Sequence, residues 1–245
     1  MLKTIERDLI NFKENIPENS DTIVVAMHGF DGSKKSSFIS DLENGCLEKN
    51  VGLIKFDWPG HGEDNSVLSV KRGLLYLETI TDHIKEKNEP KRIIAFATSF
   101  GGYLTLLFNY HHPDVFDQII LRSPAIKMDE ILLKGVLKEE ELIELDKNGS
   151  CETGKSKPIK ITSDFVEELK ENRLFELYDN KELQSVSIMH GTKDELAPFD
   201  DSKQFAEMHG CSFYPIEGAN HTYSVNGTRE IVLNKAKDLL GLMQE

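Results

Sequence analysis

A serine, a carboxylate and a histidine lie far apart in this chain, and each closely follows a short apolar run. Ser99 follows the run RIIAFA, Asp194 follows SVSIMH, and His221 follows CSFYPI. A serine hydroxyl becomes an effective nucleophile when a neighbouring imidazole removes its proton, and a carboxylate can orient that imidazole. Brought together by folding, the three side chains could perform nucleophilic catalysis through a covalent intermediate on Ser99.

This chemistry also needs hydrogen-bond donors for the oxyanion of its tetrahedral intermediate. The backbone N–H of Phe100, directly after the serine, fits that task, as does the N–H of Phe30 in the stretch HGFDG. The two glycines after Phe100 suit a sharp turn from strand to helix, where larger residues would clash. The simpler alternative is that Ser99 is an ordinary turn residue at the end of a strand.

The elements that must position these residues alternate along the chain. Six short apolar runs predict strands at 22–27, 51–56, 92–97, 118–123, 185–190 and 211–216. They lack strict polar alternation, which is typical of strands buried on both faces of a parallel sheet. Amphipathic patterns predict helices at about 34–49, 67–88, 101–111, 200–209 and 225–243.

Strands alternating with helices predict an α/β fold with a doubly wound, mostly parallel sheet. The carboxyl ends of its strands share one edge, where reactive groups gather. Residues 3–12, KTIERDLINF, fit either an edge strand or a short helix.

Residues 125–184 interrupt this alternation. Two charged amphipathic stretches, 128–146 and 163–179, predict helices, and the polar stretch KNGSCETGKSKPIK links them. We interpret 125–184 as a helical cap inserted over the sheet, which leaves 1–124 and 185–245 as the core. An ordinary pair of surface helices is the alternative.

Composition excludes several classes of protein. The chain has 245 residues, 39% of them hydrophobic, and a formal net charge of −13. Such an acidic chain without a basic stripe is not expected to bind nucleic acid. No apolar run approaches the roughly 18 residues of a membrane span, and the charged N-terminal region lacks a signal core. Three scattered cysteines argue against a disulfide framework, so a cytoplasmic protein is expected.

No metal or cofactor is expected either. His111 and His112 are adjacent, so their side chains diverge, and no second ligand pair accompanies them. His28 and His61 are expected to form hydrogen bonds within their own loops, and His190 is expected to pack in the core. Asp57 is expected to bond the turn that follows it.

The order of these motifs resembles the α/β-hydrolase fold superfamily. It is most similar to the serine aminopeptidase-like and monoglyceride-lipase-like branch, which includes bacterial cinnamoyl (feruloyl) esterases. The matching stretches are HGF, DWPGHGE, ATSFGG, GTKDELAP and GANHTY, which occur in that order between Ile23 and Tyr223. The resemblance implies a Ser99–Asp194–His221 triad without a cofactor, and a cap after the sixth strand of the fold. It also favours Asp194 over Glu195 as the acid.

One residue departs from the pattern. The family turn around the nucleophile is G-x-S-x-G, whereas Ala97 replaces the first glycine here. Alanine tolerates the strand conformation before the turn, so we expect the turn to form.

These features predict a serine hydrolase that cleaves carboxylic esters with small acyl or aromatic-acyl groups. Its partner is then a small-molecule ester. Short acyl esters, hydroxycinnamoyl esters and monoacylglycerols all remain open as substrates. Whether the chain forms a homo-oligomer also stays open. An aminopeptidase acting on small peptides is one alternative, and a non-catalytic ligand-binding protein of the same fold is another. An apolar pocket under the cap is expected, with these candidate lining residues: Phe30, Trp58, Phe100, Ile131, Leu132, Leu133, Val136, Phe165 and Leu169.

Overall fold

The computed structural model describes residues 10–179 and 181–243. A seven-stranded sheet forms its centre, with the strand order β1-β3-β2-β4-β5-β8-β9. All neighbouring strands are parallel except β1, which pairs antiparallel with β3 at one edge. The predicted α/β fold with a mostly parallel sheet is confirmed. The strands are β1 (Phe12–Asn15), β2 (Thr22–Met27), β3 (Gly52–Phe56), β4 (Arg92–Thr98), β5 (Gln118–Arg122), β8 (Val186–Gly191) and β9 (Ser212–Ile216).

The strands are apolar on both faces because helices cover both sides of the sheet. In β2, Ile23, Val25 and Met27 belong to one core cluster. Val24 and Ala26, pointing the opposite way, belong to the other. Successive strand side chains alternate between faces, so an uninterrupted apolar run supplies both cores.

Helices α3 (Val70–Asn88), α4 (Phe100–His111) and α9 (Phe199–His209) pack on the first face. Helices α2 (Ser37–Glu48) and α10 (Thr228–Leu239) pack on the second. Helix α3 begins where the Ser69 side chain accepts a hydrogen bond from the backbone N–H of Arg72, a typical N-cap. The five helices predicted outside 125–184 are present, with ends shifted by at most four residues, whereas the helix predicted over 163–179 is divided into α7 (Ser163–Glu171) and α8 (Leu174–Leu177).

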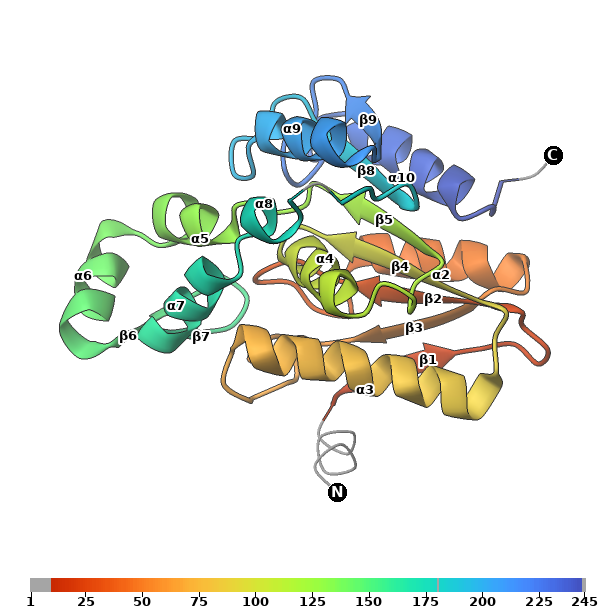
Figure 1. The fold of residues 1–245 in the computed structure, drawn as a ribbon, viewed down its shortest axis with the longest axis horizontal. Coiled ribbons are helices and arrows are strands. Elements are labelled where there is room, and N and C mark those ends of the chain that lie inside the picture. Colours follow the sequence, from red (N-terminus) through yellow and green to blue (C-terminus); the bar gives the residue numbers. More distant parts are fainter. Residues whose placement is uncertain (1–9, 180, 244–245) are drawn as a thin grey trace.

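The chain between β5 and β8 contains the elements that depart from this alternation. They are α5 (Met128–Ile131), the π-helical turn η1 (Leu132–Val136), α6 (Glu139–Asn148), β6 (Ser150–Thr153), β7 (Ile159–Thr162), α7 (Ser163–Glu171) and α8 (Leu174–Leu177). Figure 1 shows α5, α6, α7 and the β6–β7 pair at one end of the molecule.

The predicted helix over 128–146 is therefore wrong in part, because it is divided into α5, η1 and α6. The polar link after it is an antiparallel hairpin, in which Cys151 pairs with Ile161 and Thr153 with Ile159. All four of these side chains are buried on one face of the hairpin. Of the ambiguous stretch 3–12, residues 3–9 lie outside the described residues, and Phe12 begins the edge strand β1.

Candidate active site

Ser99 lies on a sharp turn between β4 and α4. Its backbone has φ 51° and ψ −116°, a combination that costs energy in any residue other than glycine. The turn persists because its backbone is bonded on both sides. The N–H of Ser99 donates to the carbonyl of Arg122 (3.0 Å), and the carbonyl of Ser99 accepts from the N–H of Ala125 (3.1 Å) and that of Tyr103.

Close packing explains the glycine two residues after Ser99. A methyl group at Gly101 would stand 2.5 Å from the carbonyl oxygen of His28, which belongs to the neighbouring strand-end loop. Ala97 lies inside β4 with a fully buried side chain. The turn is therefore built with alanine at the position where the family pattern has glycine, as expected.

Asp194 and His221 are brought together by two loops at the next strand ends. Asp194 follows β8 and His221 follows β9, and these strands are neighbours in the sheet. The N–H of Lys193 donates to the carbonyl of Ala219 (2.9 Å), which ties the two loops to each other. Gly191 permits this approach, because a side chain there would stand 2.3 Å from the same carbonyl oxygen.

The three side chains form a continuous hydrogen-bonded series. Nδ1 of His221 lies 2.7 Å from Oδ2 of Asp194, and Nε2 lies 3.0 Å from Oγ of Ser99. A carboxylate only accepts, so the Nδ1–H donates to Asp194 and leaves Nε2 free to accept the serine proton. The Asp194 side chain is fully buried and that of His221 is 11% exposed, so the pair is shielded from water. Glu195, the rejected alternative, is exposed to solvent.

Asp194 stays ionised in this setting. Its burial would raise the pKa, but hydrogen bonds from His190 and His221 outweigh that effect and hold the pKa well below the ordinary value. The second oxygen, Oδ1, accepts from the backbone N–H groups of Leu196 (3.0 Å) and Ala197 (2.8 Å). These bonds fix the orientation of the carboxylate.

His190 is a contact of Asp194 that the sequence does not reveal. It is buried as expected, but its Nε2 lies 3.0 Å from Oδ2 of Asp194 and 2.9 Å from the carbonyl oxygen of Ala197. The signal that could have found this contact is the spacing of four residues between His190 and Asp194 across the end of β8. A single carboxylate thus receives two imidazole N–H groups, only one of which leads to the serine.

The loop after β2 lies against the serine turn. The Phe30 and Phe100 rings meet edge to face, with centroids 6.1 Å apart. Within residues 10–179 and 181–243, neither the backbone N–H of Phe30 nor that of Phe100 donates a hydrogen bond to another residue. Both N–H groups are thus available to a ligand near Ser99.

Hydrogen bonds hold this loop in place. The Trp58 backbone N–H donates to Nε2 of His28 (3.2 Å), and Nδ1 of His28 meets the carbonyl of Gly29 (2.7 Å). Burial, together with the charge of neighbouring His61, lowers the pKa of His28 to about 3, so the ring stays neutral. Nδ1 of His61 meets the carbonyl of Pro59 (2.9 Å). The expectation that both histidines bond within their loops is confirmed.

Asp57 and Lys34 form a buried ion pair beneath the loop. Nζ of Lys34 lies 2.5 Å from Oδ2 of Asp57 and 2.6 Å from Glu63. Asp57 also accepts from the backbone N–H of Glu63, in the turn that follows it, as expected. The fully buried Lys34 side chain was not singled out in the sequence, because nothing local marks it as buried.

A cavity of about 720 Å³ opens over Ser99 and His221. The loop after β2 and the strand ends form one part of its wall, and residues from α5, η1, α6 and the β6–β7 hairpin form another. Three of the nine expected lining residues, Phe30, Ile131 and Val136, do line it.

The other six do not line the cavity: Trp58, Phe100, Leu132, Leu133, Phe165 and Leu169. All except Leu133 are buried in the core, and the Phe100 ring packs edge-on against Phe165. The five buried side chains are covered by packing, and the prediction that all six residues line the pocket is wrong.

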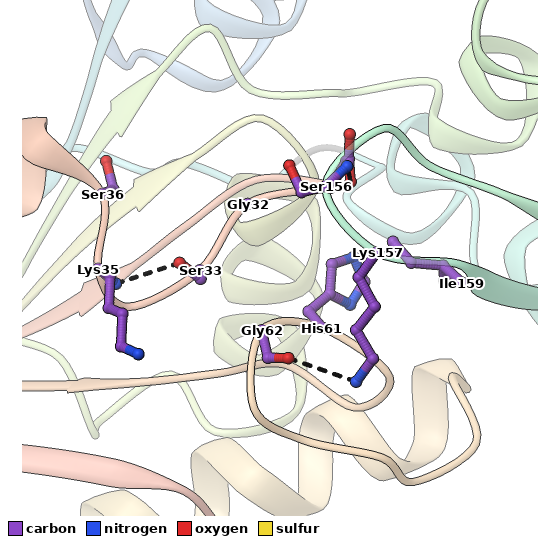
Figure 2. Close-up of a pocket in the computed structure, with 10 residues that line it drawn as sticks. Gly32, Ser33, Lys35, Ser36, His61, Gly62, Ser156, Lys157 and Ile159 are labelled. Atoms are coloured by element: carbon purple, nitrogen blue, oxygen red, sulfur yellow. Dashed lines mark hydrogen bonds between the residues drawn. The ribbon is translucent and has the colours of Figure 1, made fainter.

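A second, smaller hollow of about 320 Å³ adjoins the first and shares Asp31, Gly32 and Ser36 with it. Figure 2 shows it between the loop after β2, the loop containing His61, and the hairpin residues Ser156, Lys157 and Ile159. Nζ of Lys157 reaches across to the carbonyl of Gly62 (3.3 Å), and it also bonds Oδ1 of Asn65 (2.9 Å). Polar contacts thus tie the hairpin to the core.

No cluster of three or more metal-ligating side chains occurs in the described part of the chain. Across the same residues, no helix combines the length and the apolar character that a membrane crossing requires.

Comparison with known proteins places the chain in a family. The model of the serine aminopeptidase (S33) family matches residues 18–143, which include β2 to β5 and the serine turn. The chain belongs to the serine aminopeptidase S33 family. This S33-family chain is an α/β-hydrolase, as its sequence motifs predicted.

Solved structures of the same fold span almost the whole S33-family chain. The ferulic acid complex of Est1E from Butyrivibrio proteoclasticus is 21% identical, with a TM-score of 0.78 and 94% of each chain covered. The monoacylglycerol lipase of Paleococcus ferrophilus is 17% identical, with a TM-score of 0.70 and coverage of 96% of this chain and 99% of the lipase. At these identities the likeness shows the fold alone.

One curated relative matches over a shorter region. A Bacillus subtilis protein described as a 2-succinyl-6-hydroxy-2,4-cyclohexadiene-1-carboxylate synthase is 31% identical over 116 residues. The match covers 44% of this chain and 39% of the relative's length.

Proposed function

We propose that this α/β-hydrolase is a serine hydrolase that cleaves carboxylic esters through an acyl-Ser99 intermediate. The observation that carries the proposal is the pair of hydrogen bonds that connects the three side chains. One joins Ser99 Oγ to His221 Nε2 (3.0 Å), and the other joins His221 Nδ1 to Asp194 Oδ2 (2.7 Å). It lies at the floor of a cavity large enough for a small ester.

In the proposed mechanism, His221 removes the hydroxyl proton as Ser99 Oγ attacks the ester carbonyl carbon. The resulting imidazolium is stabilised by ionised Asp194, and it then donates the proton to the leaving alkoxide. Collapse of the tetrahedral intermediate releases the alcohol and leaves the acyl group on Ser99. A water activated by the same histidine hydrolyses that acyl group and regenerates the serine.

The oxyanion of each tetrahedral intermediate is proposed to accept from the N–H groups of Phe30 and Phe100. Support comes from their free donors, their position beside Ser99 and the polar bonds that hold their loops. Donors held in advance in this way are each worth on the order of 3 kcal/mol in the transition state.

We propose that residues 125–184 act as a cap over a core made of 1–124 and 185–245. The segment is inserted between β5 and β8, and its residues Ile131, Val136 and Gly154 line the cavity. The cap would therefore determine which acyl and alcohol groups fit, while the strand-end loops perform the chemistry.

Ester hydrolysis is preferred to peptide cleavage on the character of the structural neighbours. One was solved with ferulic acid bound, and another is a monoacylglycerol lipase. The family name, by contrast, is that of an aminopeptidase, so cleavage of small peptides is the alternative to test.

A fluorophosphonate probe tests for an activated serine. The purified wild type should be labelled rapidly, and Ser99→Ala should not be labelled at all. Inert wild-type protein, or equal labelling of both proteins, would contradict the proposal and favour a non-catalytic ligand-binding protein.

A substrate panel then distinguishes ester from peptide. The initial rates of hydrolysis of 4-nitrophenyl esters should exceed those of aminoacyl-arylamides at equal concentration, and both should vanish in Ser99→Ala. Faster release from the arylamides would assign the chain to the aminopeptidase alternative.

A further inference from the structure

Arg122 is a charged residue in the wall of the proposed active-site cavity, and no residue that the structure describes gives it an anionic partner. It ends β5, beside Thr98 in the neighbouring strand, and its own carbonyl accepts from the N–H of Ser99. Both Arg122 and Thr98 line the cavity. Within the described residues, its guanidinium has neither an ion pair nor a hydrogen-bond acceptor, and its Nε is buried.

Two other arginines in the structure are paired. Arg229 Nη2 lies 2.6 Å from Asp41, and Arg173 lies 2.9 Å from Asp129. Asp31, Glu141 and Glu195 also line the cavity, but among the residues that the structure describes no carboxylate forms an ion pair with Arg122. Arg122 is therefore a cation in the cavity wall without a carboxylate partner among the described residues.

Two aromatic rings hold the Arg122 guanidinium in place. Its central carbon lies 4.3 Å from the centroid of the Phe38 ring and 5.3 Å from that of the Tyr223 ring. Such contacts stabilise the cation and orient the plane of its N–H groups, but they satisfy none of those donors. Burial lowers the pKa of Arg122 to about 10, so the group still carries its charge at neutral pH.

The start of helix α2 faces the same part of the cavity. Ser36, Phe38 and Ile39 line the wall next to Arg122. No side chain caps this helix, and its first turn contains no acidic residue. The positive end of the helix dipole and the unpaired guanidinium therefore act on the same space, and both favour a negatively charged group.

Without a bound ligand, an unpaired Arg122 guanidinium lowers the stability of the folded protein. Buried charges are normally paired, and an apolar residue of similar size could fill the space between Phe38 and Tyr223 without that cost. The arrangement is physically reasonable if a ligand supplies the anion. A planar guanidinium with free N–H groups matches a carboxylate, which it can bind through two parallel hydrogen bonds.

We propose that Arg122, with the start of α2, forms a carboxylate-binding subsite, so that the substrate is an ester carrying a free carboxylate in its acyl or alcohol part. The proposal rests on the proposed ester hydrolysis and specifies its substrate class. It also disfavours substrates with a cationic amino group near Arg122, because like charges would repel there.

Matched pairs of substrates test this subsite in the wild type. Monoethyl esters of the straight-chain dicarboxylic acids from butanedioic to octanedioic acid are compared with ethyl esters in which an isopropyl group replaces the free carboxylate. Acetate esters of hydroxy acids and their neutral isosteres test the alcohol side in the same way. Alcohol or acid release gives kcat/KM for each. At the chain length that reaches Arg122, the anionic member should be favoured on the order of 10- to 100-fold, the contribution expected of a charge-assisted bidentate pair.

Variants then assign the preference to Arg122. Arg122→Met should abolish the preference for the anionic ester, measured as the ratio of kcat/KM for the two members of each pair, and Arg122→Lys should retain part of it. The matched control is Arg229→Met, which removes a cation 5.8 Å from the same Phe38 ring but outside the cavity wall. It should leave the preference intact. Thermal unfolding midpoints check that each variant is folded.

The outcomes distinguish the carboxylate subsite from the proposed ester hydrolysis on which it rests. Hydrolysis of neutral esters without any anionic preference in the wild type would overturn the carboxylate subsite and leave the ester hydrolase standing. A preference that survives in Arg122→Met would also overturn the subsite. No Ser99-dependent hydrolysis of any ester would instead contradict the proposed function itself.

Discussion

The sheet edge that holds Ser99, Asp194 and His221 differs in construction from the 125–184 segment beside it. At the sheet edge, functional side chains are buried and fixed by several bonds, as Asp194 is by two imidazoles and two backbone N–H groups. In 125–184, short helices and a hairpin carry many exposed charges. On its inner side that segment packs into the core through apolar side chains such as Phe165 and Leu169. Polar contacts add to this packing, among them Lys157 on Asn65 and Glu168 on the N–H of Val70.

The difference indicates a division of tasks. A reaction that depends on distances near 3 Å needs side chains that cannot move, and a buried, bonded sheet edge provides them. Selection among substrates depends on the shape of the cavity wall, and side chains of the short helices and the hairpin that line it can vary without moving the three side chains at the sheet edge. Substitutions at the sheet edge should therefore act on kcat, and those in 125–184 should act on KM.

The largest expected effect is at the sheet edge. Ser99→Ala and Asp194→Asn should each lower kcat/KM for an ester substrate by about ten-thousandfold, because they remove the nucleophile and the group that orients its base. Steady-state kinetics with a good 4-nitrophenyl ester measure this, with circular dichroism as the check on folding. A loss below about tenfold in Asp194→Asn would contradict the assigned role of the carboxylate.

A pair of glycine substitutions compares the two regions directly. Gly101→Ala places a methyl 2.5 Å from the rigid carbonyl of His28, so it should displace the oxyanion loop and lower kcat by about 100-fold or more. In 125–184, the methyl of Gly135→Ala would come close only to the end of the flexible Leu196 side chain (3.0 Å), with the Leu196 carbonyl oxygen at an ordinary 3.8 Å, so kcat should change by less than about threefold. Equal losses of kcat in the two variants would refute the contrast between the regions.

The stability of the sheet edge should fall in acid. His28 has a pKa of about 3 when folded, because of its burial, whereas an unfolded histidine titrates near 6.5. Between these values the unfolded chain binds more protons, so stability is undiminished above about pH 6.5 and is lost as the pH falls. Lowering the pH from 7 to 4.5 should cost about 2–3 kcal/mol from this residue alone.

Urea unfolding at several pH values measures that loss. His28→Gln removes the titrating ring and should flatten the dependence of the unfolding free energy on pH over this range. An unchanged slope in the variant would show that other groups are responsible.

The smallest effect is expected where the hairpin is tied to the core. Lys157→Met removes the bonds to Gly62 and Asn65, which should raise KM about threefold with kcat unchanged, since the wall loosens but the relay is untouched. Lys160→Met, an exposed lysine on the same hairpin, is the control and should behave as wild type. A large fall in kcat for Lys157→Met would mean that the hairpin takes part in the chemistry.

The same contrast explains what the sequence could predict. The sheet edge could be predicted because buried parallel strands leave uninterrupted apolar runs in the sequence. The ends of such strands also meet at one edge, wherever the strands lie in the chain. Ser99, Asp194 and His221 were located by that rule together with family motifs. Their approach was predicted, but the distances depend on contacts such as Gly191 against Ala219, which no local pattern reveals.

The 125–184 segment was less predictable for physical reasons. Its hairpin alternates polar and apolar residues over only four positions per strand, which is too short to distinguish from a loop. The aromatic residues expected in the pocket are buried elsewhere, because a large apolar side chain is stabilised by any dry environment. Arg122 ends a strand like any polar residue there, and only the structure shows that no anion accompanies it.

The most direct test of the account is the mass of the protein during turnover. Acid quenching in the presence of a 4-nitrophenyl ester, followed by peptide mapping, should show one acyl group on the peptide that contains Ser99 in the wild type, and none in Ser99→Ala. Turnover without an adduct on Ser99, or an adduct on another residue that persists in Ser99→Ala, would contradict it.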